Sequence, residues 1–304
     1  MSEPRQVYTL GDLRSWTRDT APIQLAVLGA PVAHSASPQM HMAALRACGL
    51  PHTYGRLHVL PEELAEAFAL VQKCGFLGVN LTIPHKTAVL ELLTVVDPDA
   101  RQLGAVNTVA FGPGSASGFN TDGAGLERSV SECFGVRLSE LAVLVLGAGG
   151  GAGRAISLYC GLAGCREITL VNRTLSKAEQ LAAQLRALPS PPRVRVCATG
   201  SAELDGLVQN AELILQCSSV GMRPEDPSPL DASQLHRGQL VYDTIYSNPT
   251  RLLRDAKAAG ARTADGRSML LHQGALAFEM WFQRPAPIES MREALLLALP
   301  PSHS

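Results

Sequence analysis

Short apolar runs alternate with amphipathic stretches along the first third of the chain. The aliphatic run 23–28 ends at Gly-Ala-Pro and predicts a buried strand followed by a turn. Ser37 and Pro38 supply a cap residue and a proline at the first helical position, so a helix is expected from there to Gly49. The alternation continues with expected strands at 53–59 and 78–82 and expected helices at 61–74 and 84–93. It predicts an α/β fold with a parallel or mostly parallel sheet covered on both faces.

The same pattern starts again after Gly135. The apolar run 141–146 predicts a strand, the glycine stretch 147–153 a loop, and the sequence from Arg154 to Leu162 a helix. Further strands are expected at 168–171, 194–197, 213–217 and 240–243, with a helix at 177–188. After Gly266, two helices at 269–281 and 288–299 follow without a strand between them. We expect these last helices to return to the first domain.

Composition adds two restrictions. A chain of 304 residues has room for two domains, and its 46% hydrophobic content, 17% charged content and net charge of −1 are typical of a globular protein with no nucleic-acid partner. Its seven cysteines are odd in number and contain no C-x-x-C pair, which favours reduced thiols and a cytoplasmic protein. No apolar run approaches the roughly 20 residues of a membrane span, so neither a membrane anchor nor a signal peptide is expected.

The first two dozen residues are polar and carry no motif. Two interpretations remain open for them: the segment packs against the first domain, or it forms a mobile arm.

The glycine stretch follows an expected strand and opens an expected helix, which is the context of a dinucleotide-binding loop. Glycines allow the backbone to approach a pyrophosphate, and a helix N-terminus offers free N–H groups to it. The alternative is a tight strand-to-helix turn without a ligand. The candidate residues are Gly147, Ala148, Gly149, Gly150, Gly151, Ala152 and Gly153, and Gly266 completes the set expected at the cofactor.

The end of the next strand indicates which nucleotide is bound. An acidic residue there would select NAD by accepting hydrogen bonds from the ribose 2′-hydroxyl, but this chain has none. Asn172, Arg173 and Thr174 occupy the position, and Lys177 adds a cation one helical turn later. These groups suit a 2′-phosphate and predict NADP. The alternative is a solvated helix cap formed by Thr174.

Seven motifs, in order between residues 23 and 281, resemble those of the shikimate dehydrogenase family. They are GAPVAHSASPQMH (29–41), GVNLTIPHK (78–86), GAVNTV (104–109), GFNTDGAG (118–125), VNRT (171–174), VYDTIY (241–246) and LHQGALAF (271–278). The resemblance implies NADPH-dependent reduction of 3-dehydroshikimate to shikimate, on the pathway to chorismate and the aromatic amino acids. It also implies a substrate-binding domain of residues 1–122 and 267–304 and a Rossmann-type NADP-binding domain of residues 123–266.

The resemblance also assigns roles to single residues. Lys86 and Asp122 match the catalytic pair: a lysine can deliver a proton to the nascent alkoxide, and the aspartate orients it and bonds a ring hydroxyl. Ser35 and Ser37 match the serines that hold the substrate carboxylate. The positions matched to other substrate contacts are Thr82, Asn107, Gln273 and Tyr246. Taken alone, Lys86 could be solvated, Asp122 a turn residue and Ser37 a plain N-cap. No metal is expected, and the histidines are interpreted as supporting or surface residues.

Two departures from the family pattern stand out. The glycine stretch has one more residue than G-A-G-G-x-x-R, and QCSSVGM (216–222) replaces N-A-T-x-x-G-M. Three other functions remain open. They are a quinate/shikimate dehydrogenase that uses NAD or NADP, an antibiotic-pathway homologue that acts on an amino-substituted analogue, and a non-catalytic NADP-binding sensor. The sequence leaves the choice between a monomer and a homodimer open.

Overall fold

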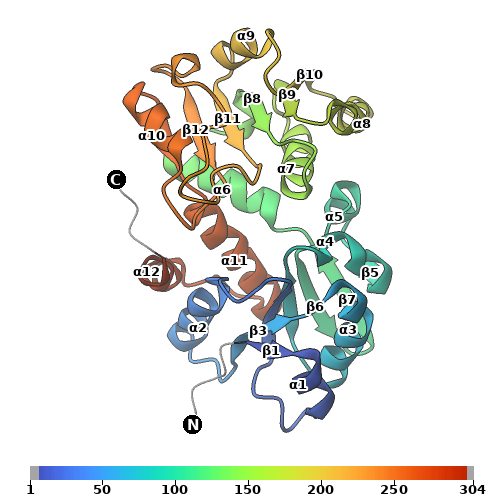
Figure 1. Cartoon of the computed structure of the whole chain (residues 1–304). Coiled ribbons are helices and arrows are strands. Elements are labelled where there is room, and N and C mark those ends of the chain that lie inside the picture. The colour runs from blue at the N-terminus through green and yellow to red at the C-terminus, as the bar shows by residue number, and fades with distance from the viewer. Residues whose placement is uncertain (1–6, 300–304) are drawn as a thin grey trace. The chain divides into compact units, whose positions relative to one another are not determined.

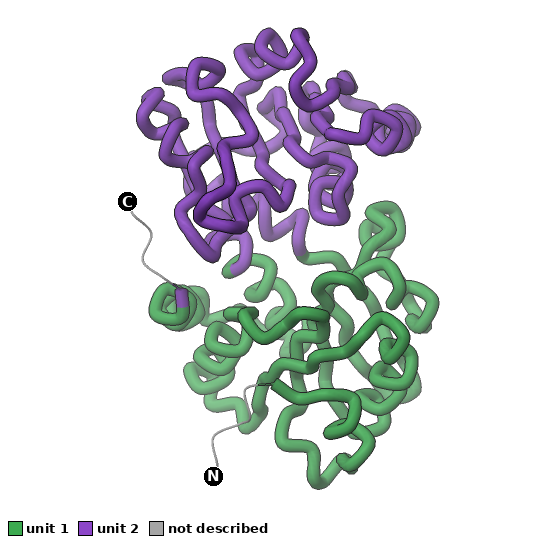
Figure 2. Tube along the Cα trace, viewed as in Figure 1, with its two compact units in different colours: residues 1–121, 271–298 green, residues 122–270, 299–304 purple. Residues whose placement is uncertain are grey.

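The computed structural model describes residues 7–299, which form two compact units (Figure 2). Of the described residues, 7–121 and 271–298 belong to unit 1, and 122–270 and 299 belong to unit 2. Asp122 and residues 267–270, which we expected in the first domain, therefore belong to unit 2.

Unit 1 contains a seven-stranded mixed sheet in the order β1-β3-β2-β4-β6-β7-β5 (Figure 1). Strands β1, β3, β2 and β4 are parallel, whereas β6 is antiparallel to both β4 and β7. A tight turn joins β6 to β7, and Gly114 in it has a φ of 68°, a value that glycine adopts without strain. The bounds are β1 Tyr8–Thr9, β2 Leu25–Gly29, β3 Tyr54–His58, β4 Gly78–Leu81, β5 Val95–Val96, β6 Thr108–Gly112 and β7 Ser115–Phe119.

The helices of unit 1 bury apolar faces against this sheet. Helix α2 also packs against α12, and α1 packs against α3. On α11, the Trp281 indole donates a hydrogen bond to the Val109 carbonyl at 2.9 Å, so close to β4 that a Cβ on Gly78 would lie 2.1 Å from the indole nitrogen. The bounds are α1 Leu10–Ser15, α2 Ser37–Ala47, η1 Pro61–Glu63, α3 Leu64–Lys73, α4 His85–Ala88, η2 Val89–Leu92, α5 Pro98–Leu103, α11 Arg267–Phe282 and α12 Ile288–Ala298.

The N-terminal segment packs against unit 1 from residue 7 onward. Strand β1 adds to the sheet by pairing with β3, and the Asp12 carboxylate accepts a hydrogen bond from the Thr9 backbone N–H at 2.8 Å at the start of α1. Leu10 and Leu13 of α1 are buried in the core of the unit. Of the two interpretations of this segment, the structure supports packing for its described part; residues 1–6 lie outside the described residues.

Unit 2 contains a six-stranded parallel sheet in the order β10-β9-β8-β11-β12-β13. Counted from β8, this is the order 3-2-1-4-5-6 of dinucleotide-binding folds. The order reverses beside β8, so the loop after β8 lies where such sheets bind ligands. The bounds are β8 Ala142–Leu146, β9 Glu167–Asn172, β10 Arg193–Ala198, β11 Leu213–Gln216, β12 Leu240–Asp243 and β13 Arg262–Ala264.

The first residue of one helix in unit 2 differs from the expectation. Helix α7 begins at Gly151 rather than at Arg154, so the last three residues of the glycine stretch are helical. The helices and their bounds are α6 Asp122–Phe134, η3 Leu138–Glu140, α7 Gly151–Leu162, α8 Leu175–Arg186, α9 Leu204–Gln209, η4 Ala232–Gln234 and α10 Arg251–Ala258.

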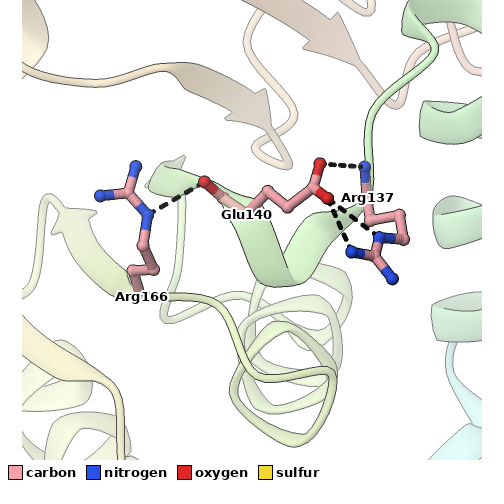
Figure 3. A network of polar contacts seen from close by, with 3 residues as sticks. All are labelled: Arg137, Glu140 and Arg166. Atoms are coloured by element: carbon pink, nitrogen blue, oxygen red, sulfur yellow. Dashed lines mark hydrogen bonds and ion pairs between the residues drawn. The ribbon is translucent and has the colours of Figure 1, made fainter.

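Surface charges connect the beginning of β8 to the loop before β9. The Glu140 carboxylate accepts hydrogen bonds from Nε and Nη2 of Arg137 at 3.0 and 2.8 Å, and the Glu140 carbonyl accepts one from Nε of Arg166 at 2.9 Å (Figure 3). This network fixes η3 at the start of β8. It is exposed and therefore contributes little stability.

None of the helices in residues 7–299 is both long and apolar enough to cross a membrane. All seven cysteines lie in this described range, and none forms a disulfide.

Candidate active site

Several of the expected substrate residues meet at one edge of the unit 1 sheet. Strands β2, β4 and β7 end at this edge, and β6 begins there. Backbone hydrogen bonds connect these ends: Thr82 N–H donates to the Leu28 carbonyl at 2.9 Å, and Leu81 N–H to the Asn107 carbonyl at 2.8 Å. Loops from distant parts of the chain, which carry Ser35, Thr82 with Lys86, and Asn107, are therefore neighbours.

The two serines lie at the start of α2. Ser37 is the first helical residue and Ala36 the N-cap, so the expectation that Ser37 caps the helix is wrong. Its hydroxyl instead accepts a hydrogen bond from the Ser35 hydroxyl at 3.2 Å. Arg56 on β3 fixes this loop by donating to the Ser35 carbonyl from Nε at 3.0 Å and from Nη2 at 2.6 Å. The Ser35 hydroxyl in turn accepts from the Ser37 N–H at 3.3 Å, so a pair of adjacent hydroxyls lies at the N-terminus of the helix.

Thr82 and Lys86 lie in a tightly constrained segment after β4. A Cβ on Gly29 would lie 2.3 Å from Cγ2 of Thr82, so this approach of β2 to Thr82 requires glycine. Between Thr82 and Lys86, the buried His85 contacts the Val59 carbonyl through Nε2 at 2.7 Å. Burial lowers the pKa of His85, so its ring is neutral and Nε2 donates that bond. Lys86 is half-buried, and its carbonyl accepts from Val106 N–H at 2.7 Å.

The Asn107 amide is held in one orientation. Its Oδ1 accepts from the Thr121 backbone N–H at 2.8 Å and from the Thr108 hydroxyl at 3.1 Å, and its Nδ2 donates to the Thr121 hydroxyl at 3.0 Å. Because a backbone N–H can only donate, the positions of oxygen and nitrogen in this amide are fixed. All three residues are buried.

The remaining expected substrate residues are divided between the units. Gln273 lies on α11 in unit 1 and is buried. Asp122 is the first residue of α6 and Tyr246 follows β12, both in unit 2. Burial raises the pKa of Tyr246, which keeps its hydroxyl protonated. Unit 1 thus brings together Ser35, Ser37, Thr82, Lys86 and Asn107, but not Asp122 or Tyr246.

The glycine stretch of unit 2 forms a tight turn at the end of β8. Gly147 has a φ of 76°, and its carbonyl accepts from Gly150 N–H at 3.0 Å. A Cβ on Gly153 would lie 2.3 Å from the Gly147 oxygen, and one on Gly149 would lie 2.6 Å from Nδ2 of Asn172. Gly151 has open space around its Cβ position, and Ala148 is buried. The turn therefore needs glycine at 147 and 149, the first two positions of the G-x-G-x-x-G/A fingerprint, and also at 153, one residue beyond its third position.

The end of β9 supports the glycine turn, and exposed cationic side chains follow it. The Asn172 amide accepts from Gly149 N–H at 3.2 Å and donates to the Thr174 carbonyl at 2.8 Å. Arg173, Thr174 and Lys177 are exposed. Within residues 7–299, the side chains of Arg173 and Lys177 have neither a hydrogen bond nor an ion pair, so both cations remain available to an anion. Thr174 is the N-cap of α8 by position, although its side chain makes no capping bond.

The segments around the glycine loop are also close-packed. A Cβ on Gly266 would lie 2.2 Å from the Thr244 carbonyl oxygen, and one on Gly147 would lie 2.6 Å from Cβ of Ser218. Gln216, one of the departures from the family pattern, is buried at the end of β11. It orders the loop after β11 by donating to the Val220 carbonyl at 2.7 Å and accepting from Ser218 N–H at 3.1 Å.

Sequence reasoning missed two supporting residues, Tyr54 and Arg56. Tyr54 and Arg56 have the pattern of strand residues, and nothing in the sequence connects them to partners far away along the chain. Metal-ligating residues were also not expected, and in the described part of the chain His, Cys, Asp and Glu form no group of three that could hold a metal ion.

The chain matches three models of one protein family. Residues 27–109 match the shikimate dehydrogenase substrate binding domain, residues 128–220 the model described as shikimate/quinate 5-dehydrogenase, and residues 266–296 the shikimate 5'-dehydrogenase C-terminal domain. Among curated relatives, the shikimate dehydrogenase (NADP(+)) of Symbiobacterium thermophilum is 47% identical over 278 residues, which cover 90% of this chain and 94% of that protein.

Solved structures are similar over the same range. A shikimate dehydrogenase in complex with NADP+ has a TM-score of 0.85 and 33% identity, covering 91% of this chain and 96% of that one. The enzyme from Thermus thermophilus, in complex with NADP(H) and shikimate, has a TM-score of 0.81 and 37% identity, covering 91% of this chain and all of that one (100%).

Proposed function

Because the chain belongs to the shikimate dehydrogenase family, we propose that it catalyses the reversible NADPH-dependent reduction of 3-dehydroshikimate to shikimate, in the pathway to chorismate and the aromatic amino acids. The observation that carries this proposal is the edge of the unit 1 sheet where Ser35, Ser37, Thr82, Lys86 and Asn107 meet. These residues would supply a carboxylate-binding pair, hydroxyl-binding groups and a proton donor within unit 1.

The substrate is a ring acid with several hydroxyls, and the side chains suit it. Ser35 and Ser37, at the N-terminus of the eleven-residue helix α2, would donate to its carboxylate. Thr82, Asn107 and Gln273 would bond ring hydroxyls, and Tyr246 would lie near the carboxylate. Each substrate hydroxyl that leaves water needs such a partner, because an unpaired buried polar group costs about 1–3 kcal/mol.

The residues of unit 2 fit NADP. The glycine turn packs closely on the end of β9, since a Cβ on Gly149 would lie 2.6 Å from Nδ2 of Asn172, while the space at the Cβ position of Gly151, at the start of α7, is open. Gly147–Gly153 would hold the pyrophosphate at the start of α7, and Asn172 would keep the loop in place. Arg173, Thr174 and Lys177 would bind the 2′-phosphate, and Gly266 would line the site. When bound, NADPH supplies the hydride that reduces the ketone.

Proton transfer is assigned to unit 1. As the ketone carbon is reduced, its oxygen gains negative charge and takes a proton, which the Lys86 ammonium would donate; in the reverse direction the Lys86 amine would accept it. Asp122 would bond a ring hydroxyl and orient the lysine. The neutral His85, buried next to Lys86 and bonded to the Val59 carbonyl, keeps this segment in place without adding charge.

The test is the initial rate of oxidation of shikimate and of quinate, each with NADP+ and with NAD+. The proposal predicts that shikimate with NADP+ exceeds every other pair by about tenfold or more in kcat/KM, which is about 1.4 kcal/mol. Comparable rates with quinate or NAD+ would replace it by a quinate/shikimate dehydrogenase. Binding of NADPH without turnover of any pair would replace it by a sensor.

We also propose a cytoplasmic location and a monomeric or homodimeric state. The seven unpaired cysteines support the first. Light scattering on the purified protein distinguishes a monomer of 32.2 kDa from a dimer, and a larger particle would contradict both.

A further inference from the structure

Tyr54 on β3 is a fully buried tyrosine with a fixed ring. The ring stacks on His41 of α2, with centroids 4.4 Å apart and planes 10° apart, and lies 6.2 Å from the Trp281 ring. Burial lowers the pKa of His41 to about 3, so the imidazole is neutral and acts as a flat packing partner. The stack directs the Tyr54 hydroxyl along the sheet rather than toward solvent.

The hydroxyl reaches across one strand. β2 separates β3 from β4, and its residues Leu25 and Val27 pair with Tyr54 and Asn80, which places both side chains on the same face. The Tyr54 hydroxyl donates to Oδ1 of Asn80 at 2.8 Å. Burial raises the pKa of Tyr54 well above its usual value, so this donor stays protonated, and an interaction with the Ser37 side chain opposes part of the rise.

Asn80 connects the Tyr54 hydroxyl to the residues at the start of β6. With Oδ1 occupied by Tyr54, its Nδ2 donates to the Thr108 hydroxyl at 3.0 Å and to the Asn107 carbonyl at 3.3 Å. The Thr108 hydroxyl then donates to Oδ1 of Asn107 at 3.1 Å. A buried hydrogen-bond path thus runs from Tyr54 through Asn80 and Thr108 to the Asn107 amide.

We infer that Tyr54 is a positioning residue of the substrate site. Its ring stacks on His41 of α2, the helix that begins at Ser37, and its hydroxyl bonds to Asn80, so it holds the carboxylate-binding and hydroxyl-binding groups at a fixed separation. The inference rests on the proposed function. A substrate with a carboxylate and hydroxyls on one rigid ring needs this separation, because it cannot adapt its own shape. Tyr54 itself need not touch the substrate.

The variant Tyr54→Phe tests this, because it keeps the stacked ring and removes only the hydroxyl. The KM for shikimate should rise about tenfold, while kcat and the KM for NADP+ stay within about twofold. Tyr242→Phe is the matched control: its buried hydroxyl also has two partners, Ser129 and Met269 N–H, but it lies in unit 2. It should lower the melting temperature and leave the KM for shikimate unchanged.

A second comparison separates positioning from a loss of stability. In an Asn80→Ala background, adding Tyr54→Phe should raise the KM for shikimate much less than it does in the wild type, because both changes remove the same hydrogen bond. An unchanged KM in Tyr54→Phe, or independent and multiplicative effects in the double variant, would overturn the inference. The wild-type protein, assayed in parallel, distinguishes failure of this inference from failure of the proposed function. If the wild type does not turn over shikimate, the proposed function fails, and the inference fails with it.

Discussion

The Asn172 side chain accepts a hydrogen bond from the Gly149 backbone N–H at 3.2 Å and so joins the end of β9 to the glycine turn after β8. Arg173 and Lys177, which flank this junction, stay exposed and have no ion-pair partner among the residues that the structure describes. A loop that binds pyrophosphate and a strand end that binds a 2′-phosphate would thereby be held in one arrangement.

Gly149→Ala should therefore weaken cofactor binding. The new Cβ would lie 2.6 Å from Nδ2 of Asn172 and 2.8 Å from Cβ of Lys177, so the turn or the end of β9 must move. We expect the KM for NADP+ to rise by about tenfold or more, with the KM for shikimate nearly unchanged. Gly206→Ala on α9, where a Cβ meets nothing within 4 Å, is the control. Equal NADP+ kinetics in both variants would contradict this account of the loop.

Arg173→Gln should change the choice between nucleotides. Removing a cation that binds the 2′-phosphate weakens NADP+ but not NAD+, so the ratio of their kcat/KM values should fall about tenfold. Lys177→Gln should act in the same direction with a smaller effect. Arg186→Gln, at the far end of α8, should leave the ratio unchanged. A proportional loss with both nucleotides would show that Arg173 does not read the 2′-phosphate.

Asp243 predicts a pH dependence of stability. Burial raises the pKa of its carboxyl to about 6, although Ile245 N–H and the Thr250 hydroxyl donate to it. The native state therefore keeps a proton that the unfolded chain loses above its own pKa of 3.8, so this group destabilises the fold as the pH rises through about 4 to 6. Between these limits the free energy of unfolding should fall about 3 kcal/mol more in the wild type than in Asp243→Asn.

Urea titrations of both proteins at a series of pH values measure this difference. Asn can accept from Ile245 N–H and donate to the Thr250 hydroxyl, so the variant should fold. Parallel curves for the two proteins would mean that Asp243 titrates normally.

Local patterns in the sequence were sufficient for much of the fold. Strands β8, β11 and β12 of unit 2 were expected from their apolar runs, whereas the short, partly exposed β13 was not. The start of α7 was misplaced because three small residues, Gly151, Ala152 and Gly153, look like loop but continue the helix. The β6–β7 hairpin was missed because its turn, Pro113-Gly114, lies between short strands with little alternation.

The site was harder to predict because it depends on register. Lys86, Ser35 and Ser37 were identifiable from motifs. The hydrogen bond from Tyr54 to Asn80, in contrast, depends on the sheet order, in which β2 lies between β3 and β4. Ser37 was expected to cap α2, yet its hydroxyl accepts from Ser35, because Ala36 occupies the cap position. No local pattern contains such contacts.

The central claim is that Lys86 transfers the proton in an otherwise intact site. The most direct test is kcat of Lys86→Met at saturating shikimate and NADP+, with NADPH binding measured by fluorescence and Lys73→Met, on the exposed end of α3, as control. The account predicts a loss of about 10³-fold in kcat with NADPH affinity unchanged. A variant that keeps kcat within about threefold of the wild type would contradict it.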